Sequence, residues 1–554
     1  MKKTIRIAAS ALAAATLLSS MSGAFACTGT YVGKNASADG TTIIALSEDI
    51  SPSDYDKIHT VVPAGDEAGR TLTDINGFSY PLPTHTYKYT TMSDYASAGD
   101  GVYPAVCTND QGVSVTGTVS ASGCDAWKTA DPTVKTGLRE AVLPALVAAT
   151  ASSAKQGVEN LLAAVDAYGS AEGNVILIAD QAGAWIVEIY GGHQYAAMKL
   201  ADDQVAVFGN QFMLGAVDPK DAENVIVSEG LYTTLETAGL TVKDDAGAVL
   251  LAQSVCGKTR SDGSNMRTWV GHERLAPASA GTYETNTFYP LLYTPDEKVS
   301  LADVMAIYRD RYQDTALDVT VAGQEGNRAI AVSTTPETHI VQIYSDLPAA
   351  CSAVTWVALG GGEHSVFLPE FSGVTETAPA YSMDAPTYTE GSAYWAFKRV
   401  CGLADVDRGL YSAGVQNFWK LQEGSLIEQM SKEVETVKGL YAADAGQAAA
   451  YVNALASDVL ADQMSKSDVL YAGLLTTLTH NEGLSASKTP ITFAPDLPLR
   501  QAAEAKGYTV SWDAAAGAVV LTKDGKSTSV ALDGVDAYAV NGVTYAAQSV
   551  VDAL

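Results

Sequence analysis

The residue with the clearest chemical potential is Cys27, which follows an apolar leader in the stretch "AFACTGT" (residues 24–30). Three basic residues precede an alanine-rich apolar run over residues 7–18, and "AFA" has the small-x-small pattern of a signal-peptide cleavage site. The run is too short for a membrane-spanning helix, which needs about 20 apolar residues. We therefore expect residues 1–26 to be removed as a signal peptide, leaving Cys27 as the first residue of a secreted or cell-envelope-associated chain.

An amino-terminal cysteine carries its own base. The free α-amine has a pKa of about 7.7–8.0 and the thiol one of about 8.5, so the amine can accept the thiol proton near neutral pH. It can later return that proton to a leaving group, which predicts acyl transfer to water, with amide hydrolysis as the natural reaction. Two other roles stay open for Cys27. One is a lipid anchor, although Ala24 stands where lipoproteins usually have leucine, and the other is a structural cysteine.

The composition narrows the possible partners. Removing the three basic residues of the leader changes the net charge from −29 to −32, and such a chain repels nucleic acids and anionic membranes. Apolar residues make up 47% and charged residues 18% of the 554-residue chain, which indicates a globular protein of two or three domains. The sequence does not determine the oligomeric state.

The six cysteines indicate neither a metal site nor a cofactor. None of them forms a C-x-x-C pair, and no two histidines stand at metal-ligand spacing. Cys107 and Cys124 are the nearest pair for a disulfide, whereas buried free thiols explain the cysteines equally well.

Short strands and helices alternate along the first part of the chain. Strands at 28–34 and 41–46 with turn residues between them predict a hairpin that begins directly after Cys27. A strand at 112–120, two helices within 138–168 and a strand hairpin over 175–190 follow. This order predicts an α+β architecture in which helices cover sheets.

The second part of the chain is predicted to hold a helical region followed by a small mixed domain. Residues 404–481 have mostly helical periodicity, and prolines cluster between 490 and 498. Beyond them the chain reads as helix, strand, turn and strand. We therefore expect a catalytic region over 27–403, a helical extension over 404–489 and a separate small domain over 490–554.

Motifs along residues 27–421 resemble one known family in their order. They include "CTGTYVGKNASADGTTIIALSEDIS", "TNDQGVSVTGTVSAS", "WIVEIYGGHQYAAMKL", "FGNQFML", "NMRTW", "RAIAVSTTPETHIVQIYSDLP", "VTWVALGGG" and "SAYWAFKRV". The chain thereby resembles the secreted dipeptidase A family of N-terminal-nucleophile (Ntn) cysteine peptidases. The resemblance implies a four-layer αββα sandwich with the nucleophile at the end of a central strand. It also implies hydrolysis of short peptides, mainly dipeptides, without a metal.

The resemblance also implies roles for five residues. Cys27 matches the nucleophile, with its α-amine as the base, and Asp49 matches an acidic residue that holds this amine. Asn109 and Asn210 match an amide pair suited to an oxyanion hole, since amides donate hydrogen bonds without titrating. Arg267 of "NMRTW" matches a basic position.

Each of these residues also has an ordinary explanation. Asp49 and Asn109 are typical turn residues, and Arg267 fits a surface ion pair. Glu140, Glu188 and His193 fall at or near matched positions too, but a helix face, a strand turn and a structural hydrogen bond explain them as well. One departure stands out at position 46, where many relatives have an arginine three residues before the Asp and this chain has Leu46. Arginine there would lower the thiol pKa.

The last 60 residues resemble the small repeat named after the amino terminus of copper amine oxidases, through "LRQAAEAKGYTVSWD" and "VNG". The resemblance implies no copper chemistry and favours a role in envelope association or spacing. For the whole chain we expect a dipeptidase. A hydrolase of non-peptide amides such as acyl-amino acids or bile-salt conjugates, and a catalytically degenerate envelope-binding protein, remain alternatives.

Overall fold

The computed structural model describes residues 27–50, 56–94, 103–257 and 260–482. Toward the carboxyl end it describes 488, 491, 499–514, 516–532, 537–540, 543–546, 550–551 and 553–554. The expected signal peptide, residues 1–26, lies outside the described residues.

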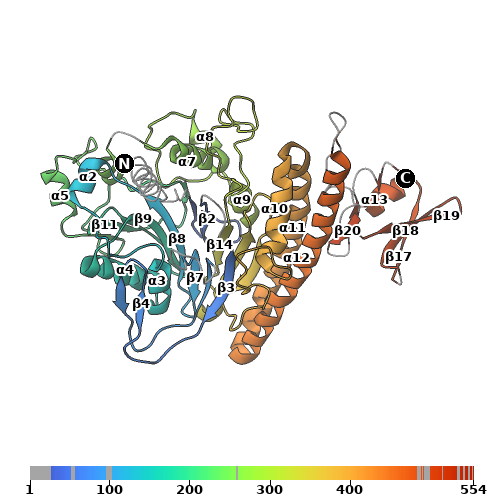
Figure 1. The fold of residues 1–554 in the computed structure, drawn as a ribbon, viewed down its shortest axis with the longest axis horizontal. Coiled ribbons are helices and arrows are strands. Elements are labelled where there is room, and N and C mark those ends of the chain that lie inside the picture. Colours follow the sequence, from blue (N-terminus) through green and yellow to red (C-terminus); the bar gives the residue numbers. More distant parts are fainter. Residues whose placement is uncertain are drawn as a thin grey trace, which may run out of the picture.

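Two antiparallel sheets form the larger, amino-terminal part of the molecule (Figure 1). The six-stranded sheet has the order β12 (Val205–Phe208), β1 (Thr28–Val32), β2 (Thr42–Glu48), β14 (Glu337–Ile343), β15 (Ala353–Leu359) and β16 (Leu368–Phe371). The eight-stranded sheet has the order β13 (Val225–Val227), β11 (Tyr195–Lys199), β10 (Gly183–Ile189), β9 (Gly173–Asp180), β8 (Ser114–Ala121), β7 (Val106–Asn109), β6 (Tyr89–Asp94) and β3 (Lys57–Val62). A small ribbon pairs β4 (Thr71–Thr73) with β5 (Ser79–Pro81). The predicted hairpin is confirmed as β1 and β2, and the predicted strands further on as β8, β9 and β10.

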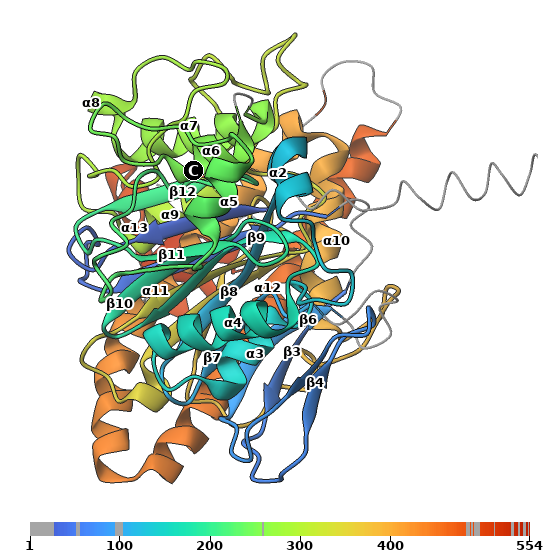
Figure 2. The same cartoon turned by 90° about the vertical axis from the view of Figure 1, so that its left-hand side faces the viewer.

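Helices cover the outer face of each sheet (Figure 2). On the eight-stranded sheet lie α3 (Leu143–Thr150) and α4 (Ala154–Tyr168), the two helices predicted within 138–168. The six-stranded sheet is covered on its other side by α7 (Asp262–Leu275) and its neighbours. The shorter helices are α2 (Asp125–Ala130), α5 (Leu231–Thr237), α6 (Leu251–Cys256), α8 (Pro277–Ala280), α9 (Leu301–Ile307) and the 3₁₀ turn Ala349–Cys351.

The side chains of β9 show how the layers are held together. Val175, Leu177 and Ala179 belong to the hydrophobic cluster that lies between the sheets. Ile176 and Ile178 alternate with them and belong to the cluster beneath α3 and α4. A strand that is apolar on both faces is buried on both faces, so the predicted four-layer αββα sandwich is confirmed.

Helix α4 shows why the sequence folds locally in this way. Ser153 caps its amino end by accepting a hydrogen bond from the Gln156 N–H, and Gly169, with φ of +71°, ends it. Val158, Leu161, Leu162 and Val165 follow the spacing of three to four residues and are buried against the sheet.

Three helices pack beside the sandwich: α10 (Ala393–Val406), α11 (Arg408–Ala443) and α12 (Ala445–Asn481). Phe418 and Trp419 of α11 share the hydrophobic cluster of the six-stranded sheet. The buried Arg309 guanidinium donates two hydrogen bonds to the Glu423 carboxylate, at 2.9 and 2.6 Å. The predicted helical region is thus confirmed, and it is joined to the sandwich by one core. No described helix, however long, has an apolar stretch that would let it cross a membrane.

The carboxyl-terminal part has a core of its own. Its elements are α13 (Leu499–Ala505), β17 (Thr509–Asp513), β18 (Ala518–Lys523), β19 (Lys526–Ala531), β20 (Ala537–Val540) and β21 (Val543–Ala546). Leu499, Val519, Leu521 and Val530 form a separate cluster. The predicted order of helix, strand, turn and strand is observed, and Figure 1 shows this part beyond the three helices.

Gly271 allows α7 to lie close against β12. A Cβ at this position would lie 2.3 Å from the Val207 Cβ, and Gly271 follows Arg267 by one helical turn. We expect Gly271→Ala to lower the free energy of unfolding by about 1–3 kcal/mol, because the helix must move away from the strand. The thermal midpoint of the main unfolding transition measures this.

Gly424→Ala is the matched control, because no atom lies within 4 Å of a Cβ at Gly424 in α11. This change should raise stability by up to about 1 kcal/mol through helix propensity alone. Equal effects of the two substitutions would contradict the close contact.

Candidate active site

The pairing of β1 with β2 positions the candidate nucleophile. Thr28 pairs with Ser47 and Gly29 with Leu46, so the same register places Cys27 beside Glu48. Directly paired residues point to the same face of a sheet. The side chains of Cys27, Leu46 and Glu48 therefore share the face that looks toward the eight-stranded sheet.

These three side chains line one wall of a small cavity. The opposite wall consists of residues 103–105, Gly117 of β8 and Glu140. Cys27 is 2% exposed, so its thiol meets the cavity rather than the protein surface. The resemblance placed the nucleophile at the end of a central strand, and the thiol lies at the start of β1.

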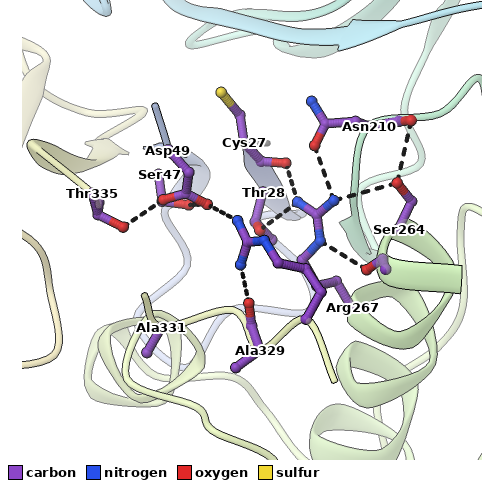
Figure 3. A network of polar contacts seen from close by, with 12 residues as sticks. Cys27, Thr28, Ser47, Asp49, Asn210, Ser264, Arg267, Ala329, Ala331 and Thr335 are labelled. Atoms are coloured by element: carbon purple, nitrogen blue, oxygen red, sulfur yellow. Dashed lines mark hydrogen bonds and ion pairs between the residues drawn. The ribbon is translucent and has the colours of Figure 1, made fainter. Parts of the chain in front are cut away.

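Arg267 approaches β1 from the other face. Its Nη1 donates to the carbonyl oxygen of Cys27 at 2.5 Å and to Thr28 Oγ1 at 3.2 Å. Its Nη2 donates to Asn210 Oδ1 at 2.9 Å and to Ser264 Oγ at 3.3 Å. Figure 3 shows the Cys27 carbonyl directed at this guanidinium and the sulfur directed away from it. The structure thus brings Cys27, Asn210 and Arg267 together.

The Arg267 side chain is buried and remains a cation. Burial is the largest cause that lowers its pKa, to about 10, and the positive charge of Arg328 acts in the same direction. A pKa near 10 still leaves the guanidinium protonated at neutral pH. It therefore supplies a fixed positive charge behind the backbone of Cys27.

Three side chains donate hydrogen bonds to the Asp49 carboxylate. The Thr335 hydroxyl donates to it at 2.5 Å, Arg328 Nη2 at 2.7 Å and the Ser47 hydroxyl at 3.3 Å. Asp49 is 1% exposed, which rules out a solvated turn residue. Neither Arg328 nor Thr335 was a candidate from the sequence, although both lie in the motif "RAIAVSTTPE" that carries the resemblance.

The environment of the Cys27 thiol disfavours its ionisation. Burial raises the thiol pKa well above its usual value, and the negative charges of Asp49 and Glu140 raise it further. A hydrogen bond from the Asp49 backbone N–H opposes this shift. A neutral thiol needs a base before it can attack a carbonyl.

The structure does not bring Asn109 to this site. Its amide Nδ2 donates to the carbonyl oxygens of Ala148 and Ala151, at 2.9 and 2.7 Å, and its Oδ1 accepts from two backbone N–H groups of its own turn. Asn109 and Cys107 are two residues apart in β7, so their side chains point to the same face of the sheet. Cys107 belongs to the cluster on the helix-covered face. The predicted pairing of Asn109 with Asn210 is therefore not observed, because backbone groups already satisfy this amide.

The other residues at matched positions divide between site and scaffold. Glu140 lines the cavity, whereas the His193 backbone N–H donates to Asp131. The buried Glu188 carboxylate accepts from the backbone N–H of Met213 and of Leu214, at 2.5 and 3.1 Å. Glu188 thereby fixes the segment that follows Asn210, and burial raises its pKa to about 7.

All six cysteines are free thiols, including the candidate pair Cys107 and Cys124. Among the described residues, Glu363, His364 and Asp405 come close enough to form a group of potential metal ligands. Arg408 forms ion pairs with both carboxylates of this group, so it is an ion-pair network.

Family models match most of the chain. The model described as peptidase family C69 matches residues 26–421, and the model described as copper amine oxidase N-terminal domain matches residues 496–551.

Curated relatives extend this finding. The chain is 32% identical over 454 residues to probable dipeptidase B of Streptococcus pyogenes serotype M1. The alignment covers 79% of this chain and 90% of that protein. The chain is 29% identical to a probable dipeptidase of Latilactobacillus sakei, with 70% and 82% covered, and 32% identical to one of Salmonella dublin, with 66% and 86% covered.

Among solved structures, a variant of conjugated bile acid hydrolase from Clostridium perfringens matches with 12% identity and a TM-score of 0.27. The match covers 62% of this chain and 92% of that one. This similarity is too low to support an assignment.

Glu188 makes stability dependent on pH. Its folded-state pKa of about 7 exceeds the usual 4.5, so its stabilising contribution is complete below about pH 4.5 and is lost as the pH rises through 7. Between pH 4.5 and pH 8 the ionisation of Glu188 therefore lowers the free energy of unfolding by up to about 3 kcal/mol. We expect this fall to be absent in Glu188→Gln, which still accepts both N–H bonds but does not ionise.

Denaturant unfolding at several pH values measures the effect. Glu159→Gln on the exposed face of α4 serves as the control and should leave the parent pH profile intact. A profile for Glu188→Gln that coincides with that of the parent would refute this assignment.

Proposed function

Because the chain belongs to peptidase family C69, we propose that it is a dipeptidase with the Cys27 thiol as its nucleophile. The observation that carries the proposal is the position of Cys27. Its thiol lines a cavity, while Arg267 holds its backbone carbonyl from the opposite face. A backbone fixed in this way keeps the sulfur in one place relative to a bound carbonyl.

The reaction begins when the free α-amine of Cys27 accepts the thiol proton. The thiolate attacks the peptide carbonyl carbon, forming a C–S bond, and the C–N bond then breaks as the α-ammonium returns the proton to the departing amine. Water attacks the resulting thioester, the C–S bond breaks, and the first amino acid leaves with a carboxylate. The thiol and the amine are thereby regenerated.

Asn210 is suited to stabilise the tetrahedral oxyanion. Its Oδ1 accepts from Arg267, so its Nδ2 must point away from the guanidinium. In Figure 3 this nitrogen lies on the side of the Cys27 sulfur. An amide donor aimed at developing negative charge typically contributes about 10²–10³ in rate. Asp49, held by Arg328 and Thr335, is the positioning residue for the α-ammonium.

The proposed substrates are short peptides rather than bulkier amides. The curated relatives are themselves named probable dipeptidases, which supports the same substrate class.

We further propose that the chain is exported and cut directly before Cys27, with the carboxyl-terminal domain contributing to envelope association. The leader pattern of residues 1–26 supports the cut. Intact mass measurement of the exported protein should give a chain that starts at Cys27 with a free amine. A diacylglycerol adduct or a different first residue would overturn the proposed activation.

A variant with one glycine inserted before Cys27, retained after cleavage, tests the mechanism. We expect it to fold but to lose at least about 10²-fold in kcat/KM on a dipeptide panel, because the amine moves away from the thiol. Cys27→Ala should abolish hydrolysis.

Cys124→Ala, a half-buried cysteine outside the cavity lining, is the control and should retain the parent rate. The mechanism is wrong if the insertion variant and Cys27→Ala cleave dipeptides as fast as the parent.

A further inference from the structure

The cavity beside Cys27 carries carboxylates on two of its walls. Glu48 comes from β2, next to Cys27 in the sheet register, and Glu140 comes from the opposite wall. Their residues are 7% and 8% exposed. Among the described residues that line the cavity, none is lysine, arginine or histidine.

We propose that this cavity recognises the free α-ammonium of the substrate's first residue through Glu140, and that this ammonium supplies the cation beside the thiol. The inference rests on the proposed dipeptidase function. It deepens that function by assigning the group that selects peptides with an unblocked amino terminus.

Glu48 is less suited to be the anchor than Glu140. The buried Lys57 ammonium forms ion pairs with both Glu48 and Asp94. Burial, despite this lysine, raises the pKa of Glu48 to about 8. Glu48 therefore has only a weak demand for a further cation.

Glu140 is oriented by Ser120 and lies beside another acidic side chain. Its Oε2 accepts a hydrogen bond from the Ser120 hydroxyl at 3.1 Å, which orients the carboxylate. Its backbone N–H donates to the Glu172 carboxylate at 2.6 Å, so a second acidic group lies close by. The neighbouring Arg139 binds the Asp74 carboxylate through Nε and Nη2, at 2.6 and 2.7 Å. A buried carboxylate in such surroundings favours a cationic ligand.

The covalent geometry of a peptide fits this placement. The α-nitrogen of the first residue lies about 2.5 Å from its carbonyl carbon, as the N–Cα and Cα–C bond lengths require. When that carbon is at the Cys27 sulfur, the ammonium must lie in the same cavity. Leu46 also lines the cavity and contributes no charge to it.

The same ammonium promotes the reaction. The negative charge of Glu140 raises the thiol pKa of Cys27, and a cation seated against this carboxylate offsets that charge. Substrates with a free amine thereby favour formation of the thiolate that attacks them.

Matched substrates test the proposal. Ala-Ala carries the ammonium, lactoyl-alanine replaces it by a hydroxyl group of similar size, and N-acetyl-Ala-Ala blocks it. We expect the mature parent protein to prefer Ala-Ala over lactoyl-alanine by about 10- to 100-fold in kcat/KM, the usual range for a hydrogen bond to a charged group.

Glu140→Gln should lower kcat/KM for Ala-Ala by the same 10- to 100-fold factor. It should not lower kcat/KM for lactoyl-alanine, because loss of the Glu140 charge also lowers the thiol pKa. Glu140→Asp, which keeps the charge, should recover part of the loss. Glu159→Gln on α4 is the matched control and should leave both rates unchanged.

The outcomes separate this inference from the function on which it rests. Equal cleavage of Ala-Ala and lactoyl-alanine by the parent, or an equal loss for both in Glu140→Gln, overturns the inference while the dipeptidase function stands. Failure of the parent to cleave any substrate, with a free amine confirmed on Cys27, overturns the function and the inference together.

Discussion

The buried guanidinium of Arg267 is the interaction on which the candidate site depends. Its donors reach the Cys27 carbonyl at the start of β1, Asn210 after β12 and the Ser264 hydroxyl on its own helix. A buried cation without partners is costly, and a guanidinium offers several donors in a fixed planar fork. Nucleophile, amide and helix α7 are therefore held in one geometry. Gly271 permits this by letting the helix approach β12 within the reach of the arginine side chain.

Strand β1 separates two regions of opposite charge. Arg267 and Arg328 lie on its helix-covered side, whereas Glu48 and Glu140 lie in the cavity on the other side. The cations hold backbone and carboxylate groups in place. Burial, together with the negative charges of Asp49 and Glu140, raises the pKa of the thiol and keeps it protonated.

Local patterns revealed part of this arrangement. Alternating residues with a turn between them were enough to predict the β1–β2 hairpin and hence the place of Cys27. Asn109 was misjudged because a turn asparagine and a catalytic one look alike in sequence. Its amide nitrogen donates to the carbonyl oxygens of Ala148 and Ala151, which only tertiary packing brings close to it. Arg328 was missed for a related reason, since its partner Asp49 lies 279 residues away and no local pattern joins them.

The two separate cores have a consequence for how the chain unfolds. The sheets and the helices α10–α12 share one hydrophobic cluster, whereas the carboxyl-terminal part has another. We therefore expect the carboxyl-terminal part to unfold in a transition of its own, separate from the main transition of the sandwich and the three helices. A core of its own also allows this small part to be lost by proteolysis while the hydrophobic cluster around the candidate site is retained.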